Sequence, residues 1–145
     1  RHIFTRQEDL DKLLLDPYCS VGSDGAVASM EGTLGELVMN RSSYGYAPRF
    51  IREYALSRKL MSVEESVRKL TSLPAESVHL RDRGQLAPGL QADLVVMDLE
   101  ALEDNTTDEK PQAYPSGIEM VMVNGEIVFD GEVHTGRKPG ELVNI

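Results

Sequence analysis

The stretch Glu119-Met-Val-Met-Val-Asn-Gly-Glu-Ile-Val-Phe129 carries the strongest local signal for structure in this chain. Its Asn-Gly pair separates two runs that are rich in β-branched and other apolar residues. A type I′ turn needs a positive φ at both central residues, which Asn and Gly adopt at little cost. We therefore predict a β-hairpin whose turn is Asn124-Gly125.

The hairpin is one part of a small set of strands predicted over residues 81–145. Ala92-Asp-Leu-Val-Val-Met97 is an apolar run of strand length, and residues 100–116 are polar and contain two prolines, which predicts a loop. A sheet of three or four strands has an apolar face that it cannot bury by itself. This region therefore needs other strands to cover it.

Residues 1–80 are predicted to be mostly helical. Thr5-Arg-Gln-Glu8 has the pattern of a capping box at the start of a first helix, which Pro17 ends. Tyr18-Cys-Ser-Val21 follows as a candidate strand, and the irregular segment after it is expected to hold one helical turn near residues 33–39. The apolar stripe of the first helix consists of Leu10, Leu13 and Leu14.

Two further helices are predicted before residue 80. One has Pro48 in its first turn, and the other starts at a second capping box, Ser62-Val-Glu-Glu65. The buried stripe of the earlier helix is expected to be Phe50, Ile51, Tyr54 and Ala55. The later helix is expected to bury Val63, Val67 and Leu70 and to present Glu64, Glu65, Arg68 and Lys69 to solvent.

The composition excludes several classes of partner. The 145 residues include 15 Lys and Arg against 24 Asp and Glu, which gives a formal net charge of −9. Such an acidic chain lacks the basic surface that nucleic acids and anionic membranes require, and it has no apolar run long enough to span a bilayer. The single Cys19 cannot form an internal disulfide, so we expect a protein of the reducing cytoplasm.

Few residues in the chain point to chemistry. The three histidines are His2, His79 and His134. They are far apart, and no His-x-His, HExxH, CxxC, GxSxG or Walker A motif occurs, so these residues predict no complete metal site. Gly22-Ser-Asp-Gly25 remains, because its acid follows a short strand. Asp24 is either a turn-capping residue or a group that projects into a cleft, as strand-end residues do in α/β barrels.

Five stretches occur in an order and at a spacing that are specific when taken together. They are Val21-Gly-Ser-Asp-Gly25, Tyr44-Gly-Tyr-Ala-Pro-Arg-Phe50, Ser62-Val-Glu-Glu-Ser-Val-Arg-Lys-Leu-Thr-Ser-Leu-Pro-Ala75, Leu80-Arg-Asp-Arg-Gly-Gln-Leu-Ala-Pro-Gly-Leu-Gln-Ala-Asp-Leu-Val-Val-Met-Asp98 and Tyr114-Pro-Ser-Gly-Ile-Glu-Met-Val-Met-Val-Asn-Gly125. On these residues the chain resembles the C-terminal third of the amidohydrolase superfamily, in the branch of the N-acyl-D-amino-acid deacylases, or D-aminoacylases. The resemblance covers nearly the whole chain.

The resemblance implies an α/β fold, in which a metal-dependent (β/α)8 barrel is joined to a small β-sandwich. Residues 1–80 would form the end of the barrel, with residues 18–24 as its last strand and residues 47–78 as closing helices. Residues 81–145 would supply the C-terminal strands of the sandwich. This division agrees with the change from helical to strand pattern near residue 80.

The resemblance also implies a reaction, the hydrolysis of a non-peptide C–N bond in an N-acyl-D-amino acid or a related amide. Asp24 would touch a zinc centre and carry a proton to the leaving nitrogen. The other metal ligands would lie upstream of Arg1, in the missing N-terminal part of the same enzyme. We therefore expect an isolated fragment, or one chain of a split enzyme, that is inactive alone and self-associates through its bare surfaces.

One motif departs from the family pattern. Deacylases usually carry His-Pro-Arg-x-Tyr-Gly, whose Arg is associated with gripping the substrate carboxylate, whereas this chain reads Asn40-Arg-Ser-Ser-Tyr-Gly45 with Ser42 at the Arg position. Arg41 and Tyr44 are the candidates for substrate binding, and Arg41 is equally well explained as a solvated loop residue. The alternative to an enzyme is a non-catalytic, β-rich interaction module, which predicts a stable, metal-free monomer without exposed apolar surface.

Overall fold

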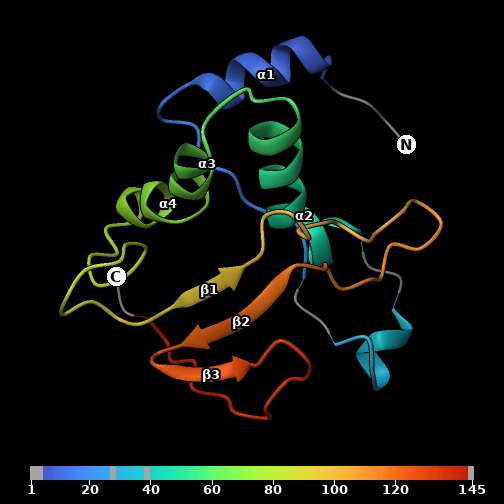
Figure 1. Cartoon of the computed structure of the whole chain (residues 1–145), viewed down its shortest axis with the longest axis vertical. Helices are drawn as coiled ribbons and strands as arrows, with labels where there is room; N and C mark the ends of the chain where they lie inside the picture. Colours follow the sequence, from blue (N-terminus) through green and yellow to red (C-terminus); the bar gives the residue numbers. More distant parts are fainter. Residues whose placement is uncertain (1–4, 27–28, 38–39, 144–145) are drawn as a thin grey trace.

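The structure, a computed structural model, describes residues 5–26, 29–37 and 40–143. Helices formed by the N-terminal half of the chain lie beside a single sheet formed by the C-terminal half (Figure 1). The helical elements are α1 (Gln7–Leu15), η1 (Thr33–Glu36), α2 (Ser42–Phe50), η2 (Ile51–Ser57), α3 (Val63–Leu70) and α4 (Ser72–Ser77). The strands are β1 (Leu94–Met97), β2 (Ile118–Val123) and β3 (Glu126–Phe129). None of the helices in these ranges is long and apolar enough to cross a membrane.

The sheet is antiparallel, with β2 in the middle and the strand order β1-β2-β3. Val123 pairs with Glu126 across the turn between β2 and β3, and Leu94 of β1 lies opposite Met122. Asn124 and Gly125 have φ values of 47° and 79°. These are the positive angles that the Asn-Gly pair predicted, so the hairpin is confirmed.

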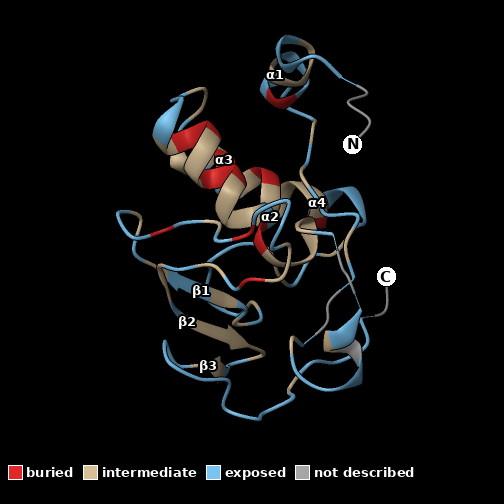
Figure 2. Cartoon of the chain, turned by 90° about the vertical axis from the view of Figure 1, so that its right-hand side faces the viewer, coloured by how far each residue is buried: buried red, intermediate tan, exposed pale blue. Residues whose placement is uncertain are grey.

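The sheet is poorly covered by the rest of the chain. No residue of the three strands is fully buried, and Val95 on β1 is 51 % exposed. Figure 2 shows the buried residues in the helices and in the loop between β1 and β2 instead. The whole chain exposes 10217 Å², whereas a compact monomer of its mass exposes about 7,400 Å². The expected lack of cover over the sheet is therefore confirmed within this chain.

The core lies between α1 and the helical segment that α2 and η2 form together. Leu14, Phe50 and Tyr54 make up its buried centre, and the rings of Phe50 and Tyr54 lie 5.5 Å apart. All four residues of the predicted stripe, Phe50, Ile51, Tyr54 and Ala55, are buried. The sequence period located this face correctly, although part of the segment is a π-helix rather than an α-helix.

Two helix starts differ from their predictions. α1 begins at Gln7 after Arg6, without a side-chain cap, so the predicted capping box at Thr5 is wrong. The Arg6 side chain pairs with Asp9 instead.

α2 begins at Ser42, six residues before Pro48, because the Asn40 side chain accepts a hydrogen bond from the Ser42 backbone and starts the first turn there. Pro48 therefore lies inside α2. The predicted helical turn near residues 33–39 is present as η1, and residues 38–39 lie outside the described part of the chain.

The predicted strand at residues 18–21 does not form. Residues 18–24 belong to no sheet in the described part of the chain, and the Val21 backbone donates to the carbonyl of Lys69 at 3.0 Å. A strand needs a neighbouring strand to take its backbone hydrogen bonds. None of the three strands described lies beside this segment, so it runs as an unpaired connection.

The prediction for α3 was partly wrong. Ser62 caps this helix as expected, with its Oγ accepting from the Glu65 backbone at 3.1 Å. The residues that α3 buries are Ser66 and Lys69, whereas Val67 is exposed. Lys69 is 1 % exposed, because its ammonium group finds carbonyl oxygens on the chain that leaves α1. A charge pattern alone could not indicate those acceptors.

A charged contact fastens α1 to the residues that follow η2. Arg58 donates both of its terminal nitrogens to the Asp11 carboxylate and lies 5.1 Å from the centre of the Tyr54 ring. These hydrogen bonds hold the pKa of Asp11 below its ordinary value of 3.8. A carboxylate with a lowered pKa in the folded state contributes stability above its unfolded pKa and loses that contribution as the pH falls through the folded pKa.

We predict that Asp11→Asn lowers the thermal midpoint of the protein near neutral pH. Because the contribution of Asp11 needs its charge, the difference between wild type and variant should disappear as the pH falls below about 4. Circular dichroism melts over a pH series measure this difference. Asp9→Asn on the same helix is the matched control. A difference for Asp11→Asn that is equal at every pH would contradict the prediction.

Candidate functional site

Asp24 lies on the segment of residues 18–26, which follows α1 and belongs to no helix or strand. Its side chain is exposed and has no hydrogen-bond or ion-pair partner among the residues described. Gly25 follows it and passes so close to α2 that an added Cβ atom would lie 2.7 Å from the Cα atom of Ser43. A side chain at Gly25 would therefore push the segment that carries Asp24 away from the start of α2.

The Asp24 carboxylate is available to bind a metal or to accept a proton. Carboxylate oxygens are common zinc ligands, and a catalytic zinc site uses three protein ligands. Within residues 5–26, 29–37 and 40–143, no group of three His, Cys, Asp or Glu side chains could hold a metal ion.

Among the described residues, His79 and His134 form no metal-binding group with Asp24. His134 follows β3, and its Nδ1 accepts a hydrogen bond from the Gly136 backbone at 2.9 Å. His79 follows α4 with a φ of 59°, and His2 lies outside the described residues.

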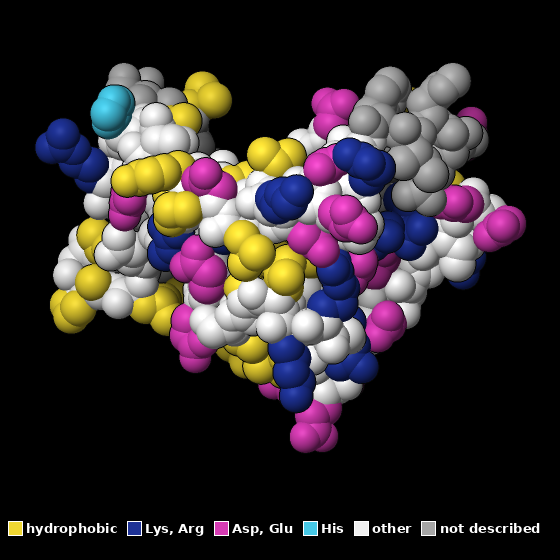
Figure 3. Space-filling view, turned by 90° about the horizontal axis from the view of Figure 1, so that it is seen from above, with side chains coloured by type: hydrophobic (Ala, Val, Ile, Leu, Met, Phe, Trp, Pro, Cys, Tyr) yellow, Lys and Arg dark blue, Asp and Glu magenta, His cyan; other side chains and the backbone are white. Residues whose placement is uncertain are grey.

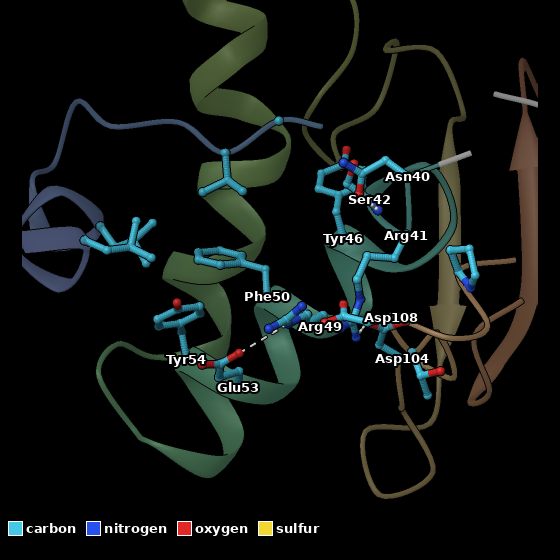
Figure 4. Close-up of a pocket in the computed structure, with 16 residues that line it drawn as sticks. Asn40, Arg41, Ser42, Tyr46, Arg49, Phe50, Glu53, Tyr54, Asp104 and Asp108 are labelled. Carbon is cyan, nitrogen blue, oxygen red and sulfur yellow. Dashed lines mark hydrogen bonds and ion pairs between the residues drawn. The ribbon is translucent and has the colours of Figure 1, made fainter. Parts of the chain in front are cut away.

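A hollow of about 840 Å³ lies beside the segment that leads to Asp24. Val21 and Gly22 form one part of its wall, and α1, α2, η2 and the loop between β1 and β2 form the rest. Figure 4 shows Phe50 and Tyr54 on the side of α1, whereas Asn40, Arg41 and Asp108 lie on the opposite side. The hollow therefore has an apolar side and a charged side, and Asp24 is not among the residues that line it.

Arg41 is held by the loop between β1 and β2. Its Nε donates to Thr106 Oγ1 at 3.0 Å, and its Nη2 donates to the Thr106 carbonyl at 2.7 Å and to Asp104 at 3.2 Å. Its Nη1 lies 3.4 Å from Asp108. All three nitrogens of the guanidinium group thus have partners inside the chain. This contact joins the start of α2 to the loop. Arg41 is therefore not the solvated loop residue that we considered as one alternative.

Tyr44, the second candidate for substrate binding, also faces this loop. Its hydroxyl lies 3.4 Å from Gln112 Nε2, and its ring meets Tyr114 edge-to-face at 6.2 Å between centres. Gln112 also donates to the carbonyls of Gly35 and Leu37. The loop between β1 and β2 therefore holds part of the segment that follows Asp24.

Sequence reasoning missed the residues that make these ties. Asp104, Gln112 and Tyr114 lie in a polar stretch that we predicted only as a loop. Their partners are 63 to 84 residues away along the chain. No local period links such positions, and only the fold brings them together.

Comparisons with known proteins identify the family. Residues 14–129 match the model of the amidohydrolase family. An N-acyl-D-glutamate deacylase and an N-acyl-D-aspartate deacylase of Alcaligenes xylosoxydans xylosoxydans are each 31 % identical over 137 residues, which are 94 % of this chain and 26 % of each relative. A D-aminoacylase of the same organism is 38 % identical over 100 residues, which are 69 % of this chain and 21 % of the relative. This chain thus spans about a quarter of the length of these curated relatives.

Solved structures agree with the sequence comparisons. A D-aminoacylase variant in complex with copper chloride has a TM-score of 0.86 and 31 % identity, over 97 % of this chain and 28 % of that chain. An N-acyl-D-glutamate deacylase of Bordetella bronchiseptica, complexed with zinc and a phosphonate inhibitor, has a TM-score of 0.76 and 32 % identity, over 88 % of this chain and 26 % of that chain. The resemblance seen in the sequence is therefore confirmed, and this chain belongs to the amidohydrolase family.

Proposed function

We propose that this chain is the C-terminal part of a zinc-dependent hydrolase that cleaves the amide bond of an N-acyl-D-amino acid or a related amide. The observation that carries this proposal is the match to three deacylases of that kind, together with the likeness to a solved N-acyl-D-glutamate deacylase that is complexed with zinc. The structure supports it through the exposed carboxylate of Asp24, which has no hydrogen-bond or ion-pair partner among the described residues.

Asp24 is the residue of this chain that takes part in the reaction. It offers one carboxylate oxygen to the metal, and the remaining ligands come from the part of the enzyme outside this chain. A zinc ion bound there acidifies water and so supplies a nucleophile near neutral pH. The Asp24 carboxylate would take a proton from the attacking water and give it to the leaving nitrogen, so that the amide yields a carboxylic acid and an amine, and the acid then gives its proton to the amine or to solvent.

The fold that we propose for the complete enzyme gives each uncovered surface a partner. Residues 1–80 form the end of a (β/α)8 barrel, in which neighbouring strands pair with residues 18–24 and fill the hollow beside Val21. Residues 81–145 form part of a β-sandwich, in which further strands cover the sheet. The lack of a strand beside residues 18–24 and the exposure of Val95 and Ile127 support this arrangement.

We predict that Asp24→Ala lowers kcat of the complete enzyme by about 10²- to 10⁴-fold, as expected for loss of a general acid and base. The assay measures release of the free amino acid from N-acyl-D-amino acids with zinc present. Asp24→Asn separates the loss of charge from the loss of the side chain and should be as inactive as Asp24→Ala. Asp9→Asn, on the surface of α1, is the matched control. Near-wild-type turnover in Asp24→Ala would rule out the proposed role.

Arg41 and Tyr44 are the residues that we propose for binding the substrate. We predict that Arg41→Ala raises KM for N-acyl-D-amino acids by about tenfold or more, because a hydrogen bond to a charged group is lost. Asp104→Asn is the matched variant, since it weakens the contact between Arg41 and the loop but keeps the guanidinium group. If KM is unchanged in both variants and the thermal midpoint falls equally, Arg41 only joins α2 to the loop and does not bind the substrate.

The missing N-terminal part of the enzyme is the partner that we propose for the apolar surface of this chain. Figure 3 looks down on the helical end of the molecule and shows hydrophobic side chains in patches between the charged ones. Leu13, Leu15 and Tyr18, around the end of α1, are all more than half exposed. This exposure disfavours the alternative of a self-contained interaction module.

We predict that the chain alone self-associates, because contiguous exposed apolar surface drives association in water. Sedimentation velocity at several concentrations measures the mass of the particle, and species heavier than the 16.1 kDa monomer are expected. Co-expression with the N-terminal part should abolish this self-association. A clean monomer over the whole concentration range would contradict the prediction.

A further inference from the structure

Lys69 is the most buried charged side chain described in the structure, and the proposed reaction leaves it without a role. Its relative exposure is 1 %. Its Nζ donates to the carbonyl of Asp16 at 2.6 Å and to the carbonyl of Cys19 at 3.0 Å, and lies 3.5 Å from a carboxylate oxygen of Glu65. An ammonium group has three hydrogens to donate, so each has an acceptor here.

The two carbonyls belong to one tight turn, at which the chain leaves α1. The Cys19 backbone donates to the carbonyl of Asp16 at 3.1 Å, and Pro17 occupies the second position of the turn. The Asp16 side chain accepts from the Tyr18 backbone at 2.8 Å. Lys69 therefore binds the first and last residues of the turn together and fixes both to the last turn of α3.

Two neighbouring contacts extend this anchor. Arg68 Nη2 donates to the carbonyl of Pro17 at 2.7 Å. The Val21 backbone donates to the Lys69 carbonyl at 3.0 Å. The end of α3 thus holds residues 16–21 by four hydrogen bonds, two from the Lys69 side chain, one from Arg68 and one from Val21.

Asp24 follows three residues after the last of these bonds. Three residues span at most about 10 Å. The turn and the carboxylate are therefore close along the chain, and a shift of the turn also shifts the carboxylate. A misplacement of about 1 Å can lower a rate by about 10²-fold. We propose that Lys69 is a positioning residue for Asp24, which acts by clamping the turn at residues 16–19 onto α3. This inference rests on the proposed function of Asp24.

The buried charge suits such a clamp better than an apolar side chain does. A methionine at this position has a similar length but donates no hydrogen bond, so the Cys19 carbonyl would lose the partner that the structure shows for it. A buried carbonyl without a partner is unfavourable, and the turn would move to find water or another donor. An apolar substitution should therefore loosen the turn rather than merely lower the packing density.

The test compares Lys69→Met and Lys69→Arg with wild type in the complete enzyme. For Lys69→Met we expect kcat to fall by at least tenfold and KM to stay within about threefold of wild type, because the turn positions the proton carrier and not the substrate. Lys69→Arg retains a charged donor and should recover part of the lost kcat. Lys12→Met, which removes an exposed lysine on α1, is the matched control and should retain wild-type kcat.

Hydrogen exchange gives a readout that does not depend on activity. In Lys69→Met the amides of residues 18–25 should exchange at least tenfold faster than in wild type, and those of β2 should be unchanged. If wild type hydrolyses no N-acyl-D-amino acid, the proposed function fails, whereas the exchange rates still decide whether Lys69 anchors this segment.

The inference is overturned if Lys69→Met keeps kcat within twofold of wild type, or if exchange at residues 18–25 is unchanged. If Lys69→Met does not yield folded enzyme, Arg68→Met is decisive, because it removes another contact to the same turn at a more exposed position. A fall of kcat with constant KM and faster exchange at residues 18–25 then supports the clamp. Wild-type values for Arg68→Met overturn it.

Discussion

The backbone hydrogen bonds of residues 18–24 constrain everything else in this molecule. An extended segment is stable in a protein interior only if neighbouring strands take its donors and acceptors. In the described part of the chain, α3 accepts from the Val21 backbone and donates to the Cys19 carbonyl through Lys69, whereas the backbone groups of residues 22–24 show no partner there. The exposed carboxylate of Asp24 and the hollow beside Val21 and Gly22 both lie along this segment.

Local patterns predicted the parts of the fold that depend on local physics. The hairpin followed from the positive φ that Asn124 and Gly125 adopt, and the buried face around Phe50 followed from helical spacing. The strand that the sequence predicted before Asp24 does not form, because no described strand takes its backbone hydrogen bonds. The freedom of Asp24 from partners among the described residues could not be predicted, because it depends on which distant residues fail to reach it.

The two misplaced helix starts involve local contacts of Arg6 and Asn40, whereas the other failures involve contacts between distant segments. Lys69 was predicted to face solvent because a charge among charges usually does so. Its acceptors are backbone carbonyls about 50 residues earlier, which carry no sequence signal. Similarly, the partners of Arg41 lie in a loop whose polar composition indicates only a loop. Residue type predicts what a side chain can bind, whereas topology decides what it meets.

The ties between the loop at residues 98–116 and the helical half have a consequence for evolution and engineering. Arg41 meets Thr106, Gln112 meets the carbonyl of Leu37, and the Tyr114 hydroxyl accepts from the backbone of Met30. A chimera joined near residue 80 would combine one parent's helices with another parent's loop and would break these matched pairs. Recombination between homologues should therefore preserve function only when the loop and the helical residues that it contacts come from the same parent.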